Sequence, residues 1–150
     1  KIIMDYIIER IKNSPYIDNK IIEFITAEKK KYIYGASLQA AVVLGIFKDI
    51  NVRIDGILLS AGMEKQNLRG YWGENLSKQT IYEIDFLPSD IKSQYVLICV
   101  EKAKAVFCKE RLRGEGFQNL FLCEWERNKY WKEICFDYYR EKLNTPLSRV

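Results

Sequence analysis

The sequence predicts an α/β fold with a doubly wound, mainly parallel sheet of five strands in the order 3-2-1-4-5, preceded by a helical pair. Short apolar runs alternate with stretches of helical period along most of the chain. The first run, at residues 32–34, breaks at Gly35 and continues as a helix. About twenty residues separate the first run from the second, a length that demands a crossover and makes the two strands parallel.

The composition indicates a folded domain with an ordinary surface. The chain has 150 residues, the length of one domain, and 48% of them are apolar. Lys and Arg number 24 against 20 Asp and Glu, and the net charge of +4 is mixed along the chain, which favours no nucleic-acid partner. The triple lysine at residues 29–31 is interpreted as a solvated entry to the first strand. Histidine is absent, so imidazole catalysis or ligation within this chain is excluded.

The four cysteines, Cys99, Cys108, Cys123 and Cys135, lie far apart and form no C-x-x-C pair. They fit neither a metal site nor a disulfide framework, and reduced thiols indicate the cytoplasm. The chain contains no run of about 18 apolar residues and no visible signal peptide, so we expect no membrane span. Because residue 1 is not Met, we expect a fragment of a longer protein whose adjacent domains are partners of this one.

Residues 1–30 are predicted to be a helical extension and residues 31–150 a single compact domain. Apolar side chains within residues 2–12 recur close to the helical period, and Asp18 begins a second helix after a turn. In the helix that follows Gly35, small residues such as Gly45 indicate close packing against the sheet.

Further strands are expected at residues 52–59, 80–84, 95–100 and 119–123, and further helices at 103–113 and 128–143. The apolar run at 95–100 is typical of a central strand covered on both faces, and the aromatic stripe of the last helix is expected to face the core. Residues 60–77 are polar and rich in glycine, which predicts a long surface loop. Its Arg69, Tyr71 and Trp72 either stack on a base as a lid or pack against the domain edge.

A ligand site is predicted where the strand order reverses, in the crevice at the carboxyl ends of the first and fourth strands. The residues expected to line it are Gly35, Ala36, Ser37 and Leu38 after the first strand, Glu101 and Lys102 after the fourth, and Ser60 on a third side. Free N–H groups at the start of the helix after Gly35, together with the helix dipole, favour a phosphate or another anion. No catalytic and no metal-binding residue is assigned.

The glycine turn departs from the dinucleotide fingerprint G-x-G-x-x-G, whose three positions are here Gly35, Ser37 and Ala40. The Ser37 side chain either crowds a phosphate or donates a hydrogen bond to it. An acid at the end of the second strand, which would bind the ribose hydroxyl, is also missing, because Leu59 and Ser60 occupy that end. Both departures argue against NAD(P) as the ligand.

In three segments the chain resembles the Rossmann-like domain of bacterial surface-polysaccharide enzymes: KYIYGAS (31–37), RIDGILLS (53–60), and YVLICV (95–100) with the helix and GFQNLF after it. The resemblance covers roughly residues 31–123. Such domains are attached to glycosyltransferases and methyltransferases, and they form the nucleotide-sugar-binding N-terminal part of sugar acetyltransferases. There the turn holds the nucleotide-sugar phosphates, which implies such a ligand at Gly35, Ala36 and Ser37. Catalytic motifs of these enzymes are absent from the sequence.

Three functions remain open on this basis. The leading interpretation is an accessory nucleotide- or nucleotide-sugar-binding domain of a polysaccharide-biosynthesis protein, not catalytic alone. The second is a protein-interaction or homodimerisation module with a degenerate nucleotide site. The third is an NAD(P)-dependent oxidoreductase or a small transferase.

Overall fold

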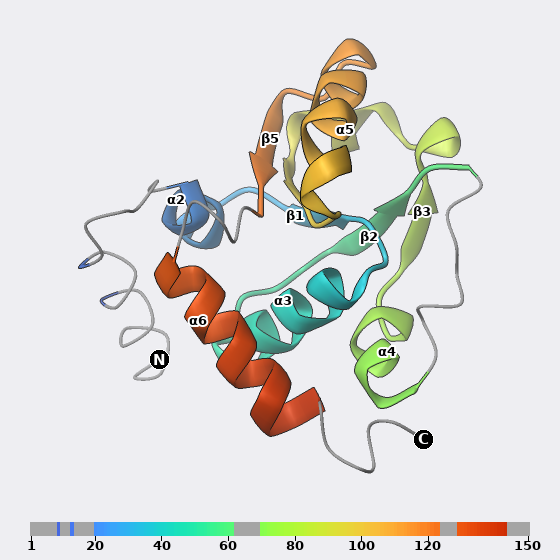
Figure 1. Ribbon diagram of the computed structural model, residues 1–150. Coiled ribbons are helices and arrows are strands. Elements are labelled where there is room, and N and C mark those ends of the chain that lie inside the picture. Colours follow the sequence, from blue (N-terminus) through green and yellow to red (C-terminus); the bar gives the residue numbers. More distant parts are fainter. Residues whose placement is uncertain (1–8, 10–12, 14–19, 62–69, 124–128, 144–150) are drawn as a thin grey trace.

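The computed structural model describes residues 9, 13, 20–61, 70–123 and 129–143, and it contains an all-parallel five-stranded sheet in the order β3-β2-β1-β4-β5 (Figure 1). The strands are β1 (Lys31–Tyr34), β2 (Gly56–Leu59), β3 (Ile81–Glu83), β4 (Tyr95–Ile98) and β5 (Asn119–Leu122). Ile33 at the centre of β1 lies opposite Ile57 of β2 and Leu97 of β4. The predicted α/β fold and strand order are therefore confirmed.

Helices cover both faces of the sheet (Figure 1). The elements are α2 (Lys20–Thr26), α3 (Leu38–Asp49), α4 (Gly70–Ser77), α5 (Lys102–Gly114) and α6 (Lys129–Tyr138), with a π-helical turn η4 (Tyr139–Leu143) after α6. In Figure 1, α3, α4 and α6 lie below the sheet and α5 lies above it. Two 3₁₀ turns, η2 (Ile84–Phe86) and η3 (Ser89–Ser93), connect β3 to β4. Consecutive parallel strands are thus joined by crossovers, as the spacing requires.

Alternate residues of each strand pack into two separate hydrophobic cores, one on each face of the sheet, because successive side chains of a strand point to opposite faces. Ile33 and Leu97 belong to the larger core, which α2, α3 and α6 share. Tyr34 and Ile98 belong to the smaller core on the α5 side. The aromatic stripe of the last helix faces the larger core as expected, with Trp131 fully buried against Phe47 of α3.

The structure corrects the expected bounds of two elements. The segment expected to be a continuous loop, residues 60–77, contains α4, which its fully buried Leu76 anchors. The second strand begins at Gly56 and not at residue 52, because the Asp55 carboxylate accepts a hydrogen bond from the Lys31 backbone N–H (2.9 Å) ahead of the ladder. Of the helix predicted at residues 2–12, only Glu9 is described, and it is helical; the rest of this helix and Asp18 lie outside the described residues. The helix predicted after Asp18 is confirmed as α2.

Gly45 in α3 lies directly against Tyr138 of α6. A Cβ placed on Gly45 would lie 2.0 Å from Oη and 2.4 Å from Cζ of Tyr138. Burial raises the pKa of Tyr138, and a hydrogen bond with Asn75 of α4 partly offsets this rise. Asn75 also donates from Nδ2 to the Ala41 carbonyl (3.2 Å), so three helices meet here.

The Gly45→Ala substitution is therefore expected to lower the free energy of unfolding by about 1–3 kcal/mol through overpacking. In a Tyr138→Ala background the same change is expected to become stabilising, by up to about 1 kcal/mol, because Ala favours a helix interior over Gly. Urea denaturation of the four proteins in this double-mutant cycle measures both values. Tyr138→Phe is the matched control, since Cζ and Cε1 remain close to the new methyl group and the clash should persist. Additive effects would contradict the proposed contact.

Candidate functional site at the carboxyl edge of the sheet

The turn after β1 brings the chain tightly against the end of β4. Gly35 has φ of +120°, and a Cβ at this position would lie 2.6 Å from the Cys99 carbonyl oxygen. The Gly35 N–H donates to the Leu58 carbonyl (3.1 Å), so the turn also contacts β2. Glycine is thus required here both by the backbone conformation and by the close approach of another strand.

Ser37 is the N-cap of α3. Its Oγ accepts a hydrogen bond from the Ala40 N–H (3.3 Å) and donates one to the Cys99 carbonyl (2.9 Å). The hydroxyl therefore caps the helix and ties it to β4, as serine at this position commonly caps helices. Of the two roles considered for Ser37, donation to a phosphate would require its proton to leave the Cys99 carbonyl.

Two backbone donors remain at the start of α3. Among the described residues, no acceptor lies within hydrogen-bonding distance of the N–H groups of Leu38 and Gln39. The first turn of α3 contains no acidic residue. The Gln39 side chain donates instead to the Cys123 carbonyl at the end of β5 (2.8 Å). These two donors and the positive end of the helix dipole together favour an anion, and no acidic side chain in the first turn balances their partial positive charge.

Ser60 lies on the α5 side of this edge, in a hydrogen bond that the sequence did not reveal. Its Oγ is 2.5 Å from the Tyr34 hydroxyl, which is buried under α5. Burial raises the pKa of Tyr34, and the hydrogen bond to Ser60 partly offsets this rise. Tyr34 alternates with Ile33 along β1, so the sequence places a tyrosine on a buried face of the strand. A buried tyrosine hydroxyl usually needs a polar partner, and this requirement could have indicated the hydrogen bond to Ser60.

Glu101 and Lys102 are solvent-exposed at the start of α5. The Glu101 carboxylate pairs with Lys104 one turn along the helix (3.2 Å), and it makes no side-chain cap on α5. The structure thus brings Gly35, Ala36, Ser37 and Leu38 together at the end of β1 and leaves Glu101 and Lys102 on the surface beyond β4. The expected lid at Arg69, Tyr71 and Trp72 lies outside the described side chains, although residues 71 and 72 belong to α4.

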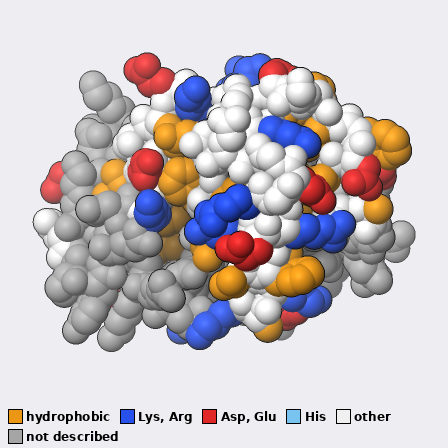
Figure 2. All heavy atoms as spheres, turned by 90° about the horizontal axis from the view of Figure 1, so that it is seen from above, with side chains coloured by type: hydrophobic (Ala, Val, Ile, Leu, Met, Phe, Trp, Pro, Cys, Tyr) orange, Lys and Arg blue, Asp and Glu red, His pale blue; other side chains and the backbone are white. Residues whose placement is uncertain are grey.

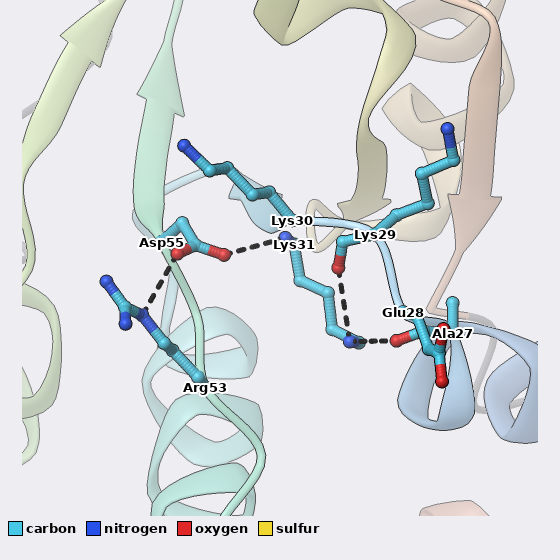
Figure 3. Close-up of a pocket in the computed structure, with 7 residues that line it drawn as sticks. All are labelled: Ala27, Glu28, Lys29, Lys30, Lys31, Arg53 and Asp55. Carbon is cyan, nitrogen blue, oxygen red and sulfur yellow. Dashed lines mark hydrogen bonds and ion pairs between the residues drawn. The ribbon is translucent and has the colours of Figure 1, made fainter.

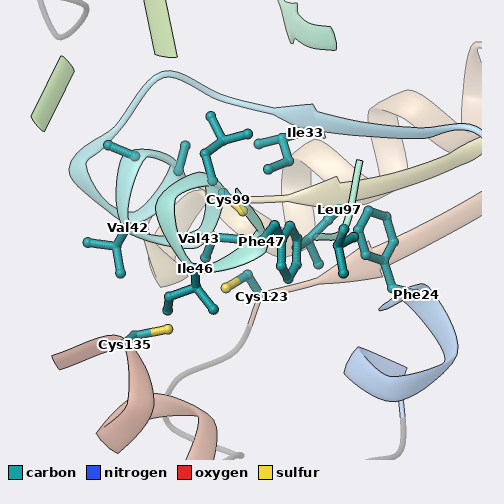
Figure 4. Packing of buried hydrophobic residues seen from close by; sticks show 14 of the residues in the cluster. Phe24, Ile33, Val42, Val43, Ile46, Phe47, Leu97, Cys99, Cys123 and Cys135 are labelled. Atoms are coloured by element: carbon teal, nitrogen blue, oxygen red, sulfur yellow. The ribbon is translucent and has the colours of Figure 1, made fainter. Parts of the chain in front are cut away.

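Three cysteines gather in the larger core beneath this edge (Figure 4). Cys99, Cys123 and Cys135 are buried, and Trp131 donates from Nε1 to the Cys123 sulfur (3.4 Å). Burial raises the pKa of Cys99 well above its ordinary value, which suppresses its thiolate. Within the described ranges, no group of three or more His, Cys, Asp or Glu side chains is placed to hold a metal ion.

We therefore expect iodoacetamide to modify one thiol per folded chain, Cys108, because it is the partly exposed cysteine. Mass spectrometry of native and urea-unfolded protein would give one and four adducts, respectively. Cys108→Ser is the control and should give none in the native state. Rapid modification of Cys123 or Cys135 under native conditions would contradict the packing of α6.

The geometry defines a doubly wound α/β domain of the Rossmann-like class, with a helix N-terminus at its topological switch point. No family model, no curated protein and no solved structure matches this chain. In the part of the chain that the structure describes, none of the helices has both the length and the apolar character needed to cross a bilayer.

Proposed function

We propose that this domain is an accessory module that binds a nucleotide or nucleotide-sugar at the start of α3. The observation that carries the proposal is the pair of unpartnered N–H groups of Leu38 and Gln39 at the switch point of the sheet. Phosphates bind in this position in folds of this class because the N–H groups and the helix dipole both favour negative charge.

In this proposal each neighbouring residue has a part that its contacts support. Gly35 lets the turn before α3 approach the end of β4, where a Cβ would lie 2.6 Å from the Cys99 carbonyl oxygen. Ser37 fixes the helix start through its bonds to Ala40 and Cys99, so its part is positioning. The ligand's phosphate accepts from Leu38 and Gln39, and its sugar or base extends over the edge toward Ser60. The domain itself supplies binding within a longer polysaccharide-biosynthesis protein, and the chemistry belongs to an adjacent domain.

Thermal-shift screening of the 150-residue chain tests this proposal. UDP-, CDP- and GDP-sugars, NAD and S-adenosylmethionine form the ligand panel. A ligand present at a hundred times its Kd stabilises by about 2.7 kcal/mol, which for this size raises Tm by several degrees. We expect a rise with one class of nucleotide-sugar and little or none with NAD. Unchanged Tm with every compound would overturn the proposal.

A second candidate function, an interaction module, is favoured by exposed apolar residues on α5. Val106 and Phe107 are 59% and 70% exposed, and Phe86 in η2 is 80% exposed. Figure 2 shows the face seen from above in Figure 1, where apolar side chains lie in small groups among Lys, Arg, Asp and Glu. Exposed large apolar side chains commonly belong to protein interfaces.

Light scattering distinguishes this second function from the first. If the domain dimerises through α5, the wild-type mass doubles with concentration and the Val106→Ser/Phe107→Ser variant stays monomeric. Binding of a nucleotide-sugar at α3 would be unaffected by this variant. A wild-type chain that is monomeric at all concentrations would remove homodimerisation from consideration.

A further inference from the structure

A hollow at the amino edge of the sheet lies at the opposite end of the strands from the α3 start. It has a volume of about 330 Å³ and is lined by Ala27, Glu28, Lys29, Lys30, Lys31, Arg53 and Asp55 (Figure 3). Its walls are the segment between α2 and β1 and the residues just before β2. We call it the amino-edge pocket.

Positive charge prevails in the amino-edge pocket, with four cationic side chains against two carboxylates. Asp55 is already engaged, since Oδ2 accepts from the Lys31 backbone N–H (2.9 Å) and Oδ1 lies 3.0 Å from Arg53 Nε. The remaining N–H groups of the Arg53 guanidinium face solvent on a side chain that is 88% exposed. The pocket thus holds more cationic groups than its own acids neutralise.

Lys31 contradicts the expectation of a solvated lysine run, because its residue is only 9% exposed whereas Lys29 and Lys30 are exposed. Its Nζ donates to the carbonyls of Ala27 (2.6 Å) and Lys29 (3.3 Å), which closes the C-terminal end of α2. This role explains why a lysine is pulled inward, since cations favour helix C-termini.

The capping role uses only two of the three N–H donors of the Lys31 ammonium group. An ammonium group has three donors, and the two carbonyls use two of them. In the described part of the chain, no further acceptor lies within hydrogen-bonding distance of Nζ, and no carboxylate lies within ion-pairing distance. Burial lowers the pKa of Lys31, and the Asp55 charge offsets this only in part. A buried cation of this kind is stabilised by an anion that enters the site.

We propose that the amino-edge pocket binds a phosphate or diphosphate group, with the third N–H of Lys31 as the fixed contact. Lys29, Lys30 and Arg53 supply the surrounding positive charge. In Figure 3 the ammonium groups of Lys29 and Lys30 point away from that of Lys31, so the proposal requires these exposed side chains to rotate inward when the anion binds. The volume exceeds that of a single phosphate, which leaves room for a second phosphate or an organic substituent.

Titration of the ¹⁵N-labelled 150-residue chain tests the proposal. Inorganic phosphate and pyrophosphate are added at constant ionic strength, with sodium chloride as the blank. We expect saturable shifts of the backbone amides at residues 29–31 and 53–55, and a Kd that rises at least about tenfold in Lys31→Met, which keeps the side-chain length. Lys104→Met, at an exposed position on α5, is the matched control and should leave Kd unchanged.

If Lys31→Met does not fold, the double variant Lys30→Gln/Arg53→Gln tests phosphate binding instead. Both of these side chains are exposed, so their substitution should preserve the fold. We expect this variant to raise Kd severalfold. Comparing inorganic phosphate with glycerol phosphate distinguishes a free ion from the phosphate of an organic ligand, since only the second would bind the ester more tightly. Non-saturating shifts, shifts equal to those with chloride, or unchanged affinity in the folded variants would overturn the proposal.

The amino-edge pocket and the α3 start can be tested independently. A substitution at Leu38 should leave phosphate binding at residues 29–31 intact, and Lys31→Met should leave nucleotide-sugar binding at α3 intact.

Discussion

Replacing Trp131 by alanine is expected to lower the free energy of unfolding by about 3–5 kcal/mol, because Trp131 is the largest fully buried side chain among the described residues. Trp131 is fully buried, and its ring stacks on Phe47 of α3 at a centroid distance of 6.2 Å. Its Nε1–H also binds the Cys123 sulfur after β5. The alanine variant loses the buried area and leaves a cavity where α6, α3 and the sheet meet.

Guanidinium denaturation at constant pH measures this loss, and Tm should fall by roughly 6–20 °C at about 2–4 °C per kcal/mol. Phe136→Ala is the matched control on the same helix. The Phe136 side chain is half-exposed, with Lys132 over its ring, so its removal should cost less than about 1 kcal/mol. Equal losses in the two variants would show that α6 does not dock through Trp131.

The second large effect is expected for Gly35→Ala, at about 2–6 kcal/mol. Two causes add: a side chain at φ of +120° is strained, at about 1–3 kcal/mol, and overpacking against β4 costs about the same. The new methyl group would meet the Cys99 carbonyl oxygen at 2.6 Å and Val100 Cγ1 at 3.1 Å. The first contact is with backbone, which cannot rotate away.

Gly116→Ala separates the two causes. Gly116 also has a positive φ, +100°, but a Cβ there would lie 3.7 Å from the nearest atom, Lys92 Cδ. Its substitution should therefore cost only the backbone strain. The difference between the two variants in urea denaturation measures the close approach of the β1 turn to β4. A Gly35→Ala variant no less stable than Gly116→Ala would mean that this approach does not exist.

The strand order was predictable because crossover length and handedness leave few arrangements for alternating strands and helices. The helix α4 was not predictable from the sequence, because Gly70 and Gly73 interrupt any helical period within it. Its stability comes from distant contacts, namely the burial of Leu76 and the bond from Asn75 to the Ala41 carbonyl. Such tertiary contacts outweigh intrinsic propensity and leave no local signal.

The position of the α3 start was predictable from the sequence, whereas its hydrogen bonds were not. The glycine turn located the start of α3 correctly, because a strand that ends at Gly35 and restarts as a helix exposes N–H groups. The role of Ser37 could not be settled from the sequence, since its partner, the Cys99 carbonyl, lies 62 residues away. The burial of Lys31 within a run of three lysines was missed for the same reason, because it depends on how α2 ends beside β1.

Leu38→Pro tests most directly the proposed binding of a phosphate by the N–H groups at the start of α3. Leu38 is the first helical residue of α3, where proline is well tolerated, and Ser37 before it is already extended at φ −91° and ψ 171°. The substitution removes one N–H donor and should preserve the fold. Leu38→Ala is the matched control, since it shortens the side chain but keeps the donor.

Isothermal titration of the wild type and both variants, with the nucleotide-sugar that gives the largest rise in Tm, is the measurement. We expect Leu38→Ala to bind with nearly the wild-type Kd and Leu38→Pro to bind about tenfold more weakly, the loss of one charge-assisted hydrogen bond. Equal affinity in a folded Leu38→Pro variant would contradict binding at this helix start.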